Sequence, residues 1–360
     1  MRPGVLQLVD TLAIGGTERV ALNLANGLPQ NRYRMFLATT RADGPLVGSV
    51  ASHVGRLALM RRRTLDLGAI YRLVRFVRAN RIGIIHAHSS SLLTAALAGA
   101  LLPGVRVVWH VHSGALAERR AGAYRALARR ASATIAVNRA LSEWCGALGA
   151  RHVHFIPNAV DLTAFPREAS ERRDVICVAN LRPEKDHPTL LRAWQLVTGQ
   201  HPEARLMLVG GGASTAYAAE LRRLCGELGI AGSVDWLGER GDVAALLAGA
   251  AIGVLSSASE GLPLALLEYG AADLAVAATD VGECGAVVDG GRAGLLVAPG
   301  DAAGLALALG RLLDDAALRQ TLGEALRRRV AAEYGSERML TRVAAIYDSL
   351  CGSEATHVQR

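Results

Sequence analysis

Short apolar runs alternate with amphipathic, helix-like stretches along almost the whole chain, and this alternation restricts the fold more than any other feature. Uninterrupted apolar strands separated by helices predict parallel sheets that are buried on both faces. Two such series in 360 residues predict an α/β protein with two doubly wound, Rossmann-like domains. The strand-like runs are residues 5–10, 33–40, 54–60, 82–88, 105–111 and 133–138, then 174–180, 204–210, 233–238, 252–257 and 275–279.

The two series are separated by a polar stretch, NAVDLTAFPREASERR, at residues 158–173. We therefore place an N-terminal domain at residues 1–165 and a second domain at 172–335. A helix at 336–360 is expected to pack back on the N-terminal domain. Since ligands bind at the carboxyl ends of parallel strands, we expect the two domains to face each other across a cleft that holds the ligand.

Charge is divided unevenly between the two series. Residues 1–170 carry 22 arginines against 8 acidic residues, a net charge of +14, whereas residues 171–360 have a net charge of −6. The basic half suits an anionic substrate, an anionic membrane surface or nucleic acid. Because it has few aromatic residues for stacking on bases and no nucleic-acid motif, we expect no nucleic-acid partner.

The five cysteines lie far apart, and none belongs to a Cys-x-x-Cys pair. This pattern is typical of neither a zinc site nor a disulfide framework, and it predicts a reducing, cytoplasmic environment. The sequence does not open with a signal-peptide pattern, and its apolar stretches are too short to span a bilayer. We therefore expect a cytoplasmic protein, at most peripheral on the inner face of the plasma membrane.

The first strand-like run leads into TLAIGGTERV, in which Gly15 and Gly16 precede a predicted helix. Glycines at this point let the backbone approach a ligand, and the free N–H groups of a helix N-terminus favour an anion. A tight turn that needs positive φ explains the pair equally simply. The pattern is not the GxGxxG fingerprint, which disfavours a nicotinamide-dependent dehydrogenase.

Four histidines stand at the ends of two successive strands, His86 and His88 in IIHAH and His110 and His112 in VVWHVH. They resemble a metal site, but no carboxylates lie nearby in the sequence to complete hydrolase chemistry, and we predict no metal. Two interpretations remain open. The histidines belong to the core or its rim, or His112 contacts a substrate.

The segment ANLRPEKDHP contains Lys185, the sole lysine of a chain that has 39 arginines. Arg182 and Lys185 follow a strand and precede a helix, which Asp186 can cap and Pro188 can begin. Two cations at such a helix N-terminus predict a diphosphate site, with an ordinary loop of solvated charges as the alternative. Lysine approaches one phosphate oxygen as a compact point charge, whereas arginine offers a flat fork.

The segment SASEGLPLALLEYGAADLAVAATD places Glu260 in a loop after a strand and Glu268 eight positions later in a helix. Carboxylates bind the diols of ribose or hexose well, because each oxygen can accept from a neighbouring hydroxyl. A loop acid and a helix-surface glutamate are the plainer alternatives.

Taken together, these segments resemble the retaining family 4 glycosyltransferases of the GT-B fold. The resemblance extends over residues 5–335 and includes GGTE, VVWHVHSG, IPNAVDLTAF, LVGGG, VDWLGER and GLLVAPGD. It implies transfer of a sugar from a nucleoside-diphosphate sugar to a glycan or polyprenyl-diphosphate-linked acceptor, in cell-surface polysaccharide or glycolipid biosynthesis. It also implies catalysis without a cofactor or bound metal.

The resemblance implies a role for each matching residue. Gly15 and Gly16 would approach the donor phosphates, and Arg182 and Lys185 would neutralise the diphosphate leaving group. In the helix, Glu268 would hold the ribose hydroxyls. The residues around the transferred sugar would be Glu260, Gly261, Leu262 and, at the reacting centre, His112. In retaining members the departing phosphate oxygen takes the acceptor's proton on the same face of the sugar.

The chain also departs from the family. After Glu268 the family usually reads Ala-Met-Ala-x-Gly-x-Pro, but Asp273 and Ala275 stand at the Gly and Pro positions here, and Glu283–Cys284 replaces small or amide residues. These changes leave the donor sugar open. A catalytically silent module in a polysaccharide-assembly complex, and a sugar-nucleotide epimerase or hydrolase on the same fold, remain alternatives. The basic half would meet an anionic membrane, with Arg61–Arg63 and Arg119–Arg120 as candidate contacts.

Overall fold

The computed structural model describes residues 2–112, 121–165 and 174–352. The chain divides into two compact units, one formed by residues 1–158 with 337–360 and the other by residues 159–336. The sequence places the end of the first domain at 165, whereas residues 159–165 belong to the second unit. The physical reason is local, because Val160 pairs with Gly335 and both Val160 and Phe165 pack into the core of the second unit.

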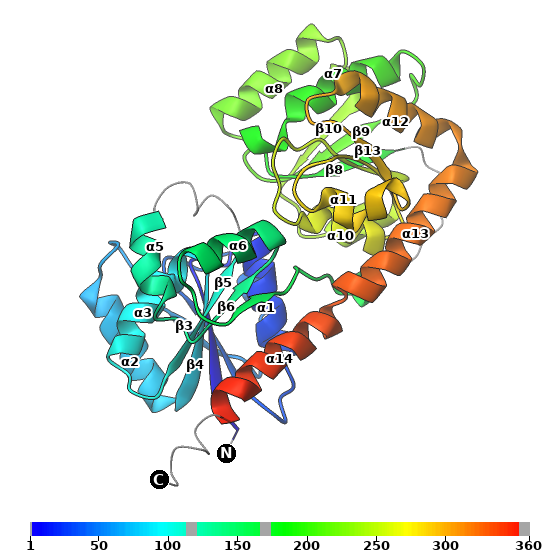
Figure 1. The fold of residues 1–360 in the computed structure, drawn as a ribbon. Helices are drawn as coiled ribbons and strands as arrows, with labels where there is room; N and C mark the ends of the chain where they lie inside the picture. The colour runs from blue at the N-terminus through cyan, green and yellow to red at the C-terminus, as the bar shows by residue number, and fades with distance from the viewer. Residues whose placement is uncertain (1, 113–120, 166–173, 353–360) are drawn as a thin grey trace. The chain divides into compact units, whose positions relative to one another are not determined.

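The first unit is built on a parallel sheet whose described strands have the order β3-β2-β1-β4-β5-β6-β7. Helices cover both faces, with α2 and α3 on one side and α1 and α14 on the other (Figure 1). The strands are β1 (Gly4–Val9), β2 (Arg34–Thr39), β3 (Gly55–Ala58), β4 (Ile82–His88), β5 (Arg106–Val111), β6 (Ala133–Ala136) and β7 (Val153–Phe155). The helices are α1 (Gly16–Gly27), α2 (Leu67–Ala79), α3 (Leu92–Ala100), α5 (Ala121–Ala128), α6 (Arg139–Ala147) and α14 (Ser336–Gly352).

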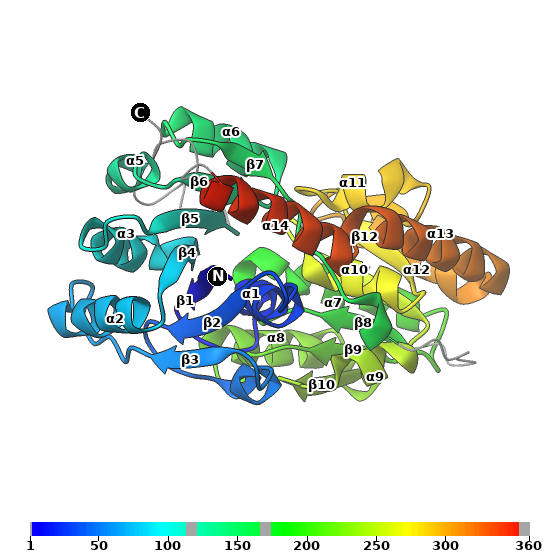
Figure 2. The same cartoon turned by 90° about the horizontal axis from the view of Figure 1, so that it is seen from below.

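Alternation along these strands separates two environments in the first unit. Leu6, Leu8, Ile85 and Ala87 point into an apolar core shared with α2, α3, α5 and α6. Their neighbours point to the opposite face, where α14 packs through the fully buried Tyr347. Tyr347 of α14, the helix that Figure 2 shows from below, contacts Gln7 of β1 and His86 of β4.

The second unit has a parallel sheet of order β10-β9-β8-β11-β12-β13 among its described strands. One apolar core lies between this sheet and α7, α8 and α12, and another lies between the sheet and α9, α10, α11 and α13. The strands are β8 (Val175–Val178), β9 (Leu206–Val209), β10 (Val234–Gly238), β11 (Ile252–Leu255), β12 (Ala275–Thr279) and β13 (Leu295–Val297). The helices are α7 (His187–Thr198), α8 (Ala216–Glu227), α9 (Val243–Ala248), α10 (Leu264–Ala271), α11 (Cys284–Val287), α12 (Ala302–Asp314) and α13 (Ala316–Tyr334).

Two parallel, doubly wound sheets confirm the predicted α/β fold class. Within the described residues, no helix is both long enough and apolar enough to cross a bilayer.

Candidate functional site

The second unit has a topological switch point between β8 and β11. The chain builds β8, β9 and β10 outward and then returns to place β11 on the other side of β8. The loops that follow β8 and β11 therefore diverge, and such a point is where open parallel sheets bind their ligands. The β8 loop carries Arg182 and Lys185, and the β11 loop carries Glu260.

Lys185 and Glu260 meet at this switch point. The Lys185 ammonium donates to Glu260 Oε1 at 2.6 Å, and the Ser257 hydroxyl donates to the same oxygen at 2.6 Å. The Glu260 side chain is 8% exposed and that of Lys185 is 23% exposed. A nearly buried carboxylate thus has its charge balanced by the lysine, whose remaining donors can bind an anion.

Backbone contacts hold the two loops together. The Ser256 hydroxyl donates to the carbonyl of Lys185 at 2.9 Å, and the amide of Ala258 donates to the carbonyl of Glu184 at 3.0 Å. Gly282 approaches from the β12 loop with φ of +56°, and a Cβ there would lie 2.2 Å from the carbonyl oxygen of Glu260. The position of Glu260 therefore depends on a glycine 22 residues further along the chain.

The predicted cap of the following helix is confirmed. The Asp186 carboxylate accepts from the amide and hydroxyl of Thr189, at 3.3 and 2.7 Å, and Pro188 lies in the first turn of α7. Arg182 lies just before η4 (Pro183–Lys185), with its side chain 65% exposed and 3.9 Å from Glu184. The guanidinium thus reaches solvent at the mouth of the sheet.

Gly261 and Leu262 continue the β11 loop into α10. The carbonyl of Gly261 accepts from the amide of Glu283 at 3.0 Å, so its backbone supports the turn beside Glu260. The side chain of Leu262 is buried in the core of the second unit. Packing of Leu262 into this core therefore fixes the position of the β11 loop.

Glu268 is buried in α10, which rules out a helix-surface glutamate. A buried carboxylate is uncommon unless it is paired or used. Its neighbour Tyr269 is fully buried, and its hydroxyl accepts from the amide of Val178 at 2.7 Å and donates to the carbonyl of Val254 at 3.2 Å. This bridge between β8 and β11 fits because Gly253 has no side chain, and a Cβ there would lie 2.6 Å from the Tyr269 ring.

Two departures from the family pattern have a structural explanation. Asp273, at the family's glycine position, adopts φ of +62°, the left-handed conformation that glycine enters without strain. Its carboxylate lies 3.8 Å from Arg327. Cys284 is fully buried, and burial raises the pKa of its thiol to about 12, so it is neutral at physiological pH.

The first unit has its own switch point between β1 and β4, and the predicted helix follows β1. α1 begins at Gly16, with Gly15 preceding it at φ of −160°. That is extended backbone that any residue adopts, so the tight-turn explanation for Gly15 fails. The Thr11 hydroxyl donates to Glu18 at 3.1 Å in the first turn.

All four histidines of the two His-x-His pairs lie together on the α14 face of the first sheet. His86 and His88 stack with their ring centroids 4.7 Å apart, and the rings of His110 and His112 lie 4.1 Å apart. Ring nitrogens join the two strands, His86 Nε2 to His110 Nδ1 at 3.1 Å and His88 Nδ1 to His112 Nε2 at 2.9 Å. His86, His88 and His110 are buried, and His112, just after β5, is partly exposed.

Burial keeps these imidazoles neutral. Loss of water lowers the pKa of His86 and of His112 to about 3, although a hydrogen bond with Asn158 opposes the shift at His112. The same cause, reinforced by the neighbouring imidazoles, lowers the pKa of His88 and His110 well below the ordinary value.

Three of these rings are close enough to share a metal ion. Ligand atoms of His86, His88 and His110 all lie within 4.8 Å of one another. However, both nitrogens of His86 and of His88 already have hydrogen-bond partners, as does Nδ1 of His110. We assign no metal to this group, because binding one would require these hydrogen bonds to break.

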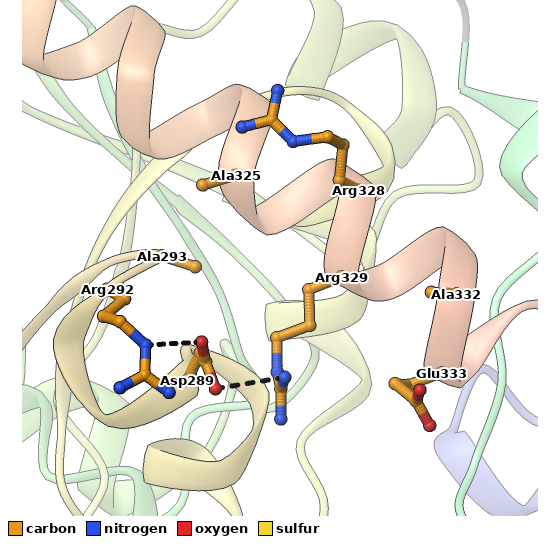
Figure 3. A pocket seen from close by; sticks show the side chains of 8 residues that line it. All are labelled: Asp289, Arg292, Ala293, Ala325, Arg328, Arg329, Ala332 and Glu333. Carbon is orange, nitrogen blue, oxygen red and sulfur yellow. Dashed lines mark hydrogen bonds and ion pairs between the residues drawn. The ribbon is translucent and has the colours of Figure 1, made fainter.

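A hollow of about 320 Å³ lies between α13 and the segment after α11 (Figure 3), and neither Lys185 nor Glu260 lines it. Its arginines are already paired within the described chain. Asp289 accepts from Arg292 at 2.7 Å and lies 3.1 Å from Arg329, while Arg328 lies 3.6 Å from Glu324. We assign it no ligand.

Comparison with known proteins agrees with this geometry. Residues 14–164 match the family model described as Glycosyltransferase Family 4, and residues 172–315 match the model described as Glycosyl transferases group 1. The lipopolysaccharide core biosynthesis mannosyltransferase LpcC of Rhizobium leguminosarum bv. viciae is 30% identical over 250 residues, which cover 66% of this chain and 70% of that protein. The chain is a family 4 glycosyltransferase.

Other relatives and structures extend the comparison. A glycogen synthase of Mycobacterium tuberculosis is 27% identical to this glycosyltransferase over 288 residues, 75% of this chain and 69% of the relative. The crystal structure of Anabaena Alr3699/HepE in complex with UDP and glucose superposes with a TM-score of 0.83 at 20% identity, covering 96% of this chain and 99% of that one. The two sheets of this glycosyltransferase are those of the GT-B fold.

Several residues that shape the site escape sequence reasoning. Tyr269, Ser257 and Gly282 support the Glu260 loop through contacts that no local pattern announces. In the first unit, Gln7 leaves a signal, because it is a polar residue inside the apolar strand GVLQLV. Tyr347 leaves none, since an aromatic residue in an amphipathic helix is ordinary. Arg119 and Arg120 lie outside the described residues.

Proposed function

We propose that this glycosyltransferase is a retaining enzyme that moves a sugar from a nucleoside-diphosphate sugar to a glycan or lipid-linked acceptor in cell-surface polysaccharide or glycolipid biosynthesis. The observation that carries the proposal is the pair of Lys185 and Glu260 at the β8/β11 switch point. The names of relatives agree with this role, since one acts in lipopolysaccharide core biosynthesis and a structural neighbour was solved with UDP and glucose.

The chemistry requires charge stabilisation above all. When the bond between the sugar's anomeric carbon and the diphosphate breaks, negative charge grows on the departing oxygen. A preorganised hydrogen-bond donor or cation near such a charge lowers the barrier by about 2.7–4 kcal/mol. Lys185 is preorganised by Glu260 before any donor binds, and the exposed Arg182 can add a planar fork to the same diphosphate.

The remaining steps keep the configuration of the sugar. The acceptor oxygen forms its bond to the anomeric carbon on the face that the diphosphate leaves, and the acceptor proton passes to the departing phosphate oxygen. Glu260 accepts hydrogen bonds from hydroxyls of the transferred sugar. The backbone of Gly261 and the packing of Leu262 hold the Glu260 loop in place. His112 contacts the sugar near the reacting carbon.

The nucleoside end of the donor and its phosphates have their own contacts in this proposal. Glu268 accepts from the ribose hydroxyls, for which its buried carboxylate offers two oxygens. Gly15 and Gly16 let the N-terminus of α1 approach the phosphates, where free N–H groups favour an anion.

No bound metal takes part in the proposed reaction, because Lys185 and Arg182 supply the positive charge that a divalent cation supplies elsewhere. Transfer should therefore keep its rate after dialysis against EDTA. Loss of activity that added Mg²⁺ or Mn²⁺ restores would contradict this part of the proposal.

Thermal shift measurements with UDP, GDP, ADP and NAD test the donor class. A ligand at 100 times its Kd stabilises the folded state by about 2.7 kcal/mol, which raises the Tm of a unit of this size by roughly 5–10 °C. One nucleoside diphosphate should produce the shift in the wild type but not in Lys185→Ala. Arg192→Ala, which removes an exposed cation from α7, is the matched control and should keep the shift. A shift with NAD alone, or with no diphosphate, would reject the proposal.

Product analysis separates transfer from the other reactions of this fold. With donor and acceptor together, a transferase yields a glycoside whose anomeric configuration NMR shows to be that of the donor. An epimerase or hydrolase alters the donor without an acceptor, and a silent module alters nothing. Inversion at the anomeric carbon would contradict the retaining mechanism.

We propose further that the acceptor is reached at an anionic membrane on the cytoplasmic side, through a surface at residues 60–71. Four large apolar side chains there are between 58% and 80% exposed, namely Met60, Leu65, Leu67 and Tyr71. Arg62, Arg63, Arg72 and Arg75 are exposed beside them. Apolar side chains that enter the interface, together with arginines that attract anionic headgroups, are the usual elements of peripheral attachment.

Arg61 does not belong to this surface, although the sequence groups it with its neighbours. Its side chain is 12% exposed, it donates to the carbonyl of Thr64 at 3.1 Å, and it lies 3.7 Å from Asp10. Local hydrogen bonding therefore turns it inward. The membrane contacts that remain from this cluster are Arg62 and Arg63.

Sedimentation with vesicles tests the surface. The wild type should bind phosphatidylglycerol-containing vesicles, and added salt should weaken the binding because it screens the arginines. Leu65→Gln with Leu67→Gln should weaken binding at every salt concentration. Leu307→Gln, which changes a leucine that is 71% exposed on α12 of the other unit, is the matched control. Equal binding by all three proteins, or binding that salt leaves unchanged, would contradict the proposal.

A further inference from the structure

A continuous chain of hydrogen bonds connects α14 to His112 through the interior of the first unit. Gln7 stands at its centre and is fully buried in β1. On one side its amide contacts His88 Nε2 at 2.9 Å, and His88 contacts His112. On the other side it contacts the Tyr347 hydroxyl at 3.0 Å, which contacts His86 Nδ1 at 2.5 Å.

The neutral state of the imidazoles makes this chain directional. A neutral imidazole carries one proton, so a ring that donates through one nitrogen must accept through the other. The Tyr347 hydroxyl has one proton as well, and leaving it unpaired inside the protein would be costly. Whether one group in the chain donates or accepts a hydrogen bond therefore determines whether the next group donates or accepts.

The direction can be followed from the amide of Gln7 as it is placed. Its NH₂ group donates to Tyr347, so the hydroxyl donates to His86 Nδ1, and His86 Nε2–H donates to His110 Nδ1. Its oxygen accepts from His88 Nε2–H, so His88 Nδ1 accepts from His112 Nε2–H. All four histidines then carry their proton on Nε2.

Reversing the Gln7 amide reverses every bond in the chain. The NH₂ group would then donate to His88, and the Tyr347 hydroxyl would donate to Gln7. Following the same atoms, all four histidines would carry their proton on Nδ1. A mixture of tautomers would leave donor facing donor or acceptor facing acceptor at one of the contacts.

We infer that Gln7 is a positioning residue that couples the four histidines into one shared tautomer and thereby decides whether His112 Nδ1 donates or accepts. His112 Nε2 is hydrogen-bonded to His88, so Nδ1 is the ring nitrogen that can interact with Asn158 or with a ligand. With the amide as placed, Nδ1 carries no proton and can accept a hydrogen bond, for instance from a sugar hydroxyl. This last consequence rests on the proposed function, whereas the coupling itself does not.

Long-range ¹H–¹⁵N NMR of the full chain labelled with ¹⁵N-histidine reads the tautomer of each neutral ring. The signals of His86, His88, His110 and His112 are assigned from their loss in single His→Gln variants. The wild type should show one tautomer, the same at all four positions. Different tautomers within the group, or averaging at His112, would overturn the inference whether or not the Gln7 and Tyr347 variants fold.

Two substitutions test separately the two sides of Gln7, one leading to Tyr347, His86 and His110 and the other to His88 and His112. In Tyr347→Phe the hydroxyl is gone, so His86 and His110 should become mixtures of tautomers, while His88 and His112 keep the single tautomer that Gln7 imposes. In Gln7→Met, His88 and His112 should become mixtures of tautomers, because the amide that bonds His88 is gone. Gln30→Met, at an exposed glutamine, should leave all four signals unchanged. A single, unchanged tautomer at His112 in Gln7→Met would overturn the inference.

Steady-state kinetics link the network to the proposed transfer. Gln7→Met should lower kcat about ten-fold and leave the KM for the donor near the wild-type value, because Gln7 itself contacts neither the proposed phosphate residues Lys185 and Arg182 of the other unit nor Gly15 and Gly16. Tyr347→Phe should keep kcat within about two-fold. If the NMR pattern holds and no donor is turned over by the wild type, the proposed function fails and the coupling stands. If transfer occurs but the tautomers are independent, the coupling fails alone.

Discussion

Mild acid should destabilise the first unit, because it contains four neutral histidines, of which three are buried and His112 is partly exposed. In the unfolded chain a histidine has its ordinary pKa of about 6.5 and binds a proton as the pH falls below that value. In the folded state burial lowers the pKa of His86 and His112 to about 3, and that of His88 and His110 well below the ordinary value. The stability that these groups contribute is therefore complete above pH 6.5 and is lost between pH 6.5 and about 3.

The size of the loss follows from proton linkage. One pKa unit corresponds to about 1.36 kcal/mol, so at pH 5 His86 and His112 each lower the free energy of unfolding by about 2 kcal/mol. Their sum of about 4 kcal/mol, to which His88 and His110 add in the same direction, is a large part of the 5–15 kcal/mol that stabilises a typical domain. Asp66 and Asp235, whose pKa values hydrogen bonds lower below 3.8, contribute little to the loss at pH 5 and above, because their carboxylates are ionised there in both the folded and the unfolded chain.

Urea unfolding monitored at pH 7.5, 6.0 and 5.0 measures this dependence. The free energy of unfolding of the wild type should fall steeply below pH 6.5, and His110→Phe should reduce the slope by about 1.4 kcal/mol per pH unit. His53→Gln, at an exposed histidine, is the matched control and should leave the slope unchanged. A wild-type stability that stays constant from pH 7.5 to 5.0 would refute the reasoning.

Three further predictions concern the second unit. Lys185→Arg should lower kcat/KM for transfer about ten-fold or more with little change in Tm, because a guanidinium can still pair with Glu260 but its longer, flat fork cannot place a compact charge on one phosphate oxygen, and wild-type turnover would contradict this. Tyr269→Phe should lower the free energy of unfolding by about 1–3 kcal/mol in urea titrations, since the amide of Val178 loses its buried acceptor; an unchanged midpoint would show that water or another group takes over. Gly282→Ala should destabilise by about 1–3 kcal/mol and weaken nucleotide binding in calorimetry, whereas Gly232→Ala, where a Cβ meets open space, should do neither.

The sequence by itself determined whatever depends on neighbours along the chain. The periodicity of apolar residues predicted two doubly wound parallel sheets, because burial on both faces leaves its mark within each strand. The cap at Asp186 and the first-turn Pro188 were predictable for the same reason, since both act within three residues of their position. Placing Arg182, Lys185 and Glu260 at strand ends was enough to group them as candidate site residues.

The tertiary structure decided which of these residues touch. Lys185 and Glu260 are 75 positions apart, and Gln7 and Tyr347 are 340 apart, so only the crossover between β8 and β11 and the return of α14 bring each pair together. Arg61 and Arg62 are neighbours with the same charge, yet hydrogen bonds turn one inward and leave the other in solvent. A strand pattern records that a side chain is buried, but its partner is set by strand order and helix packing, which no local pattern contains.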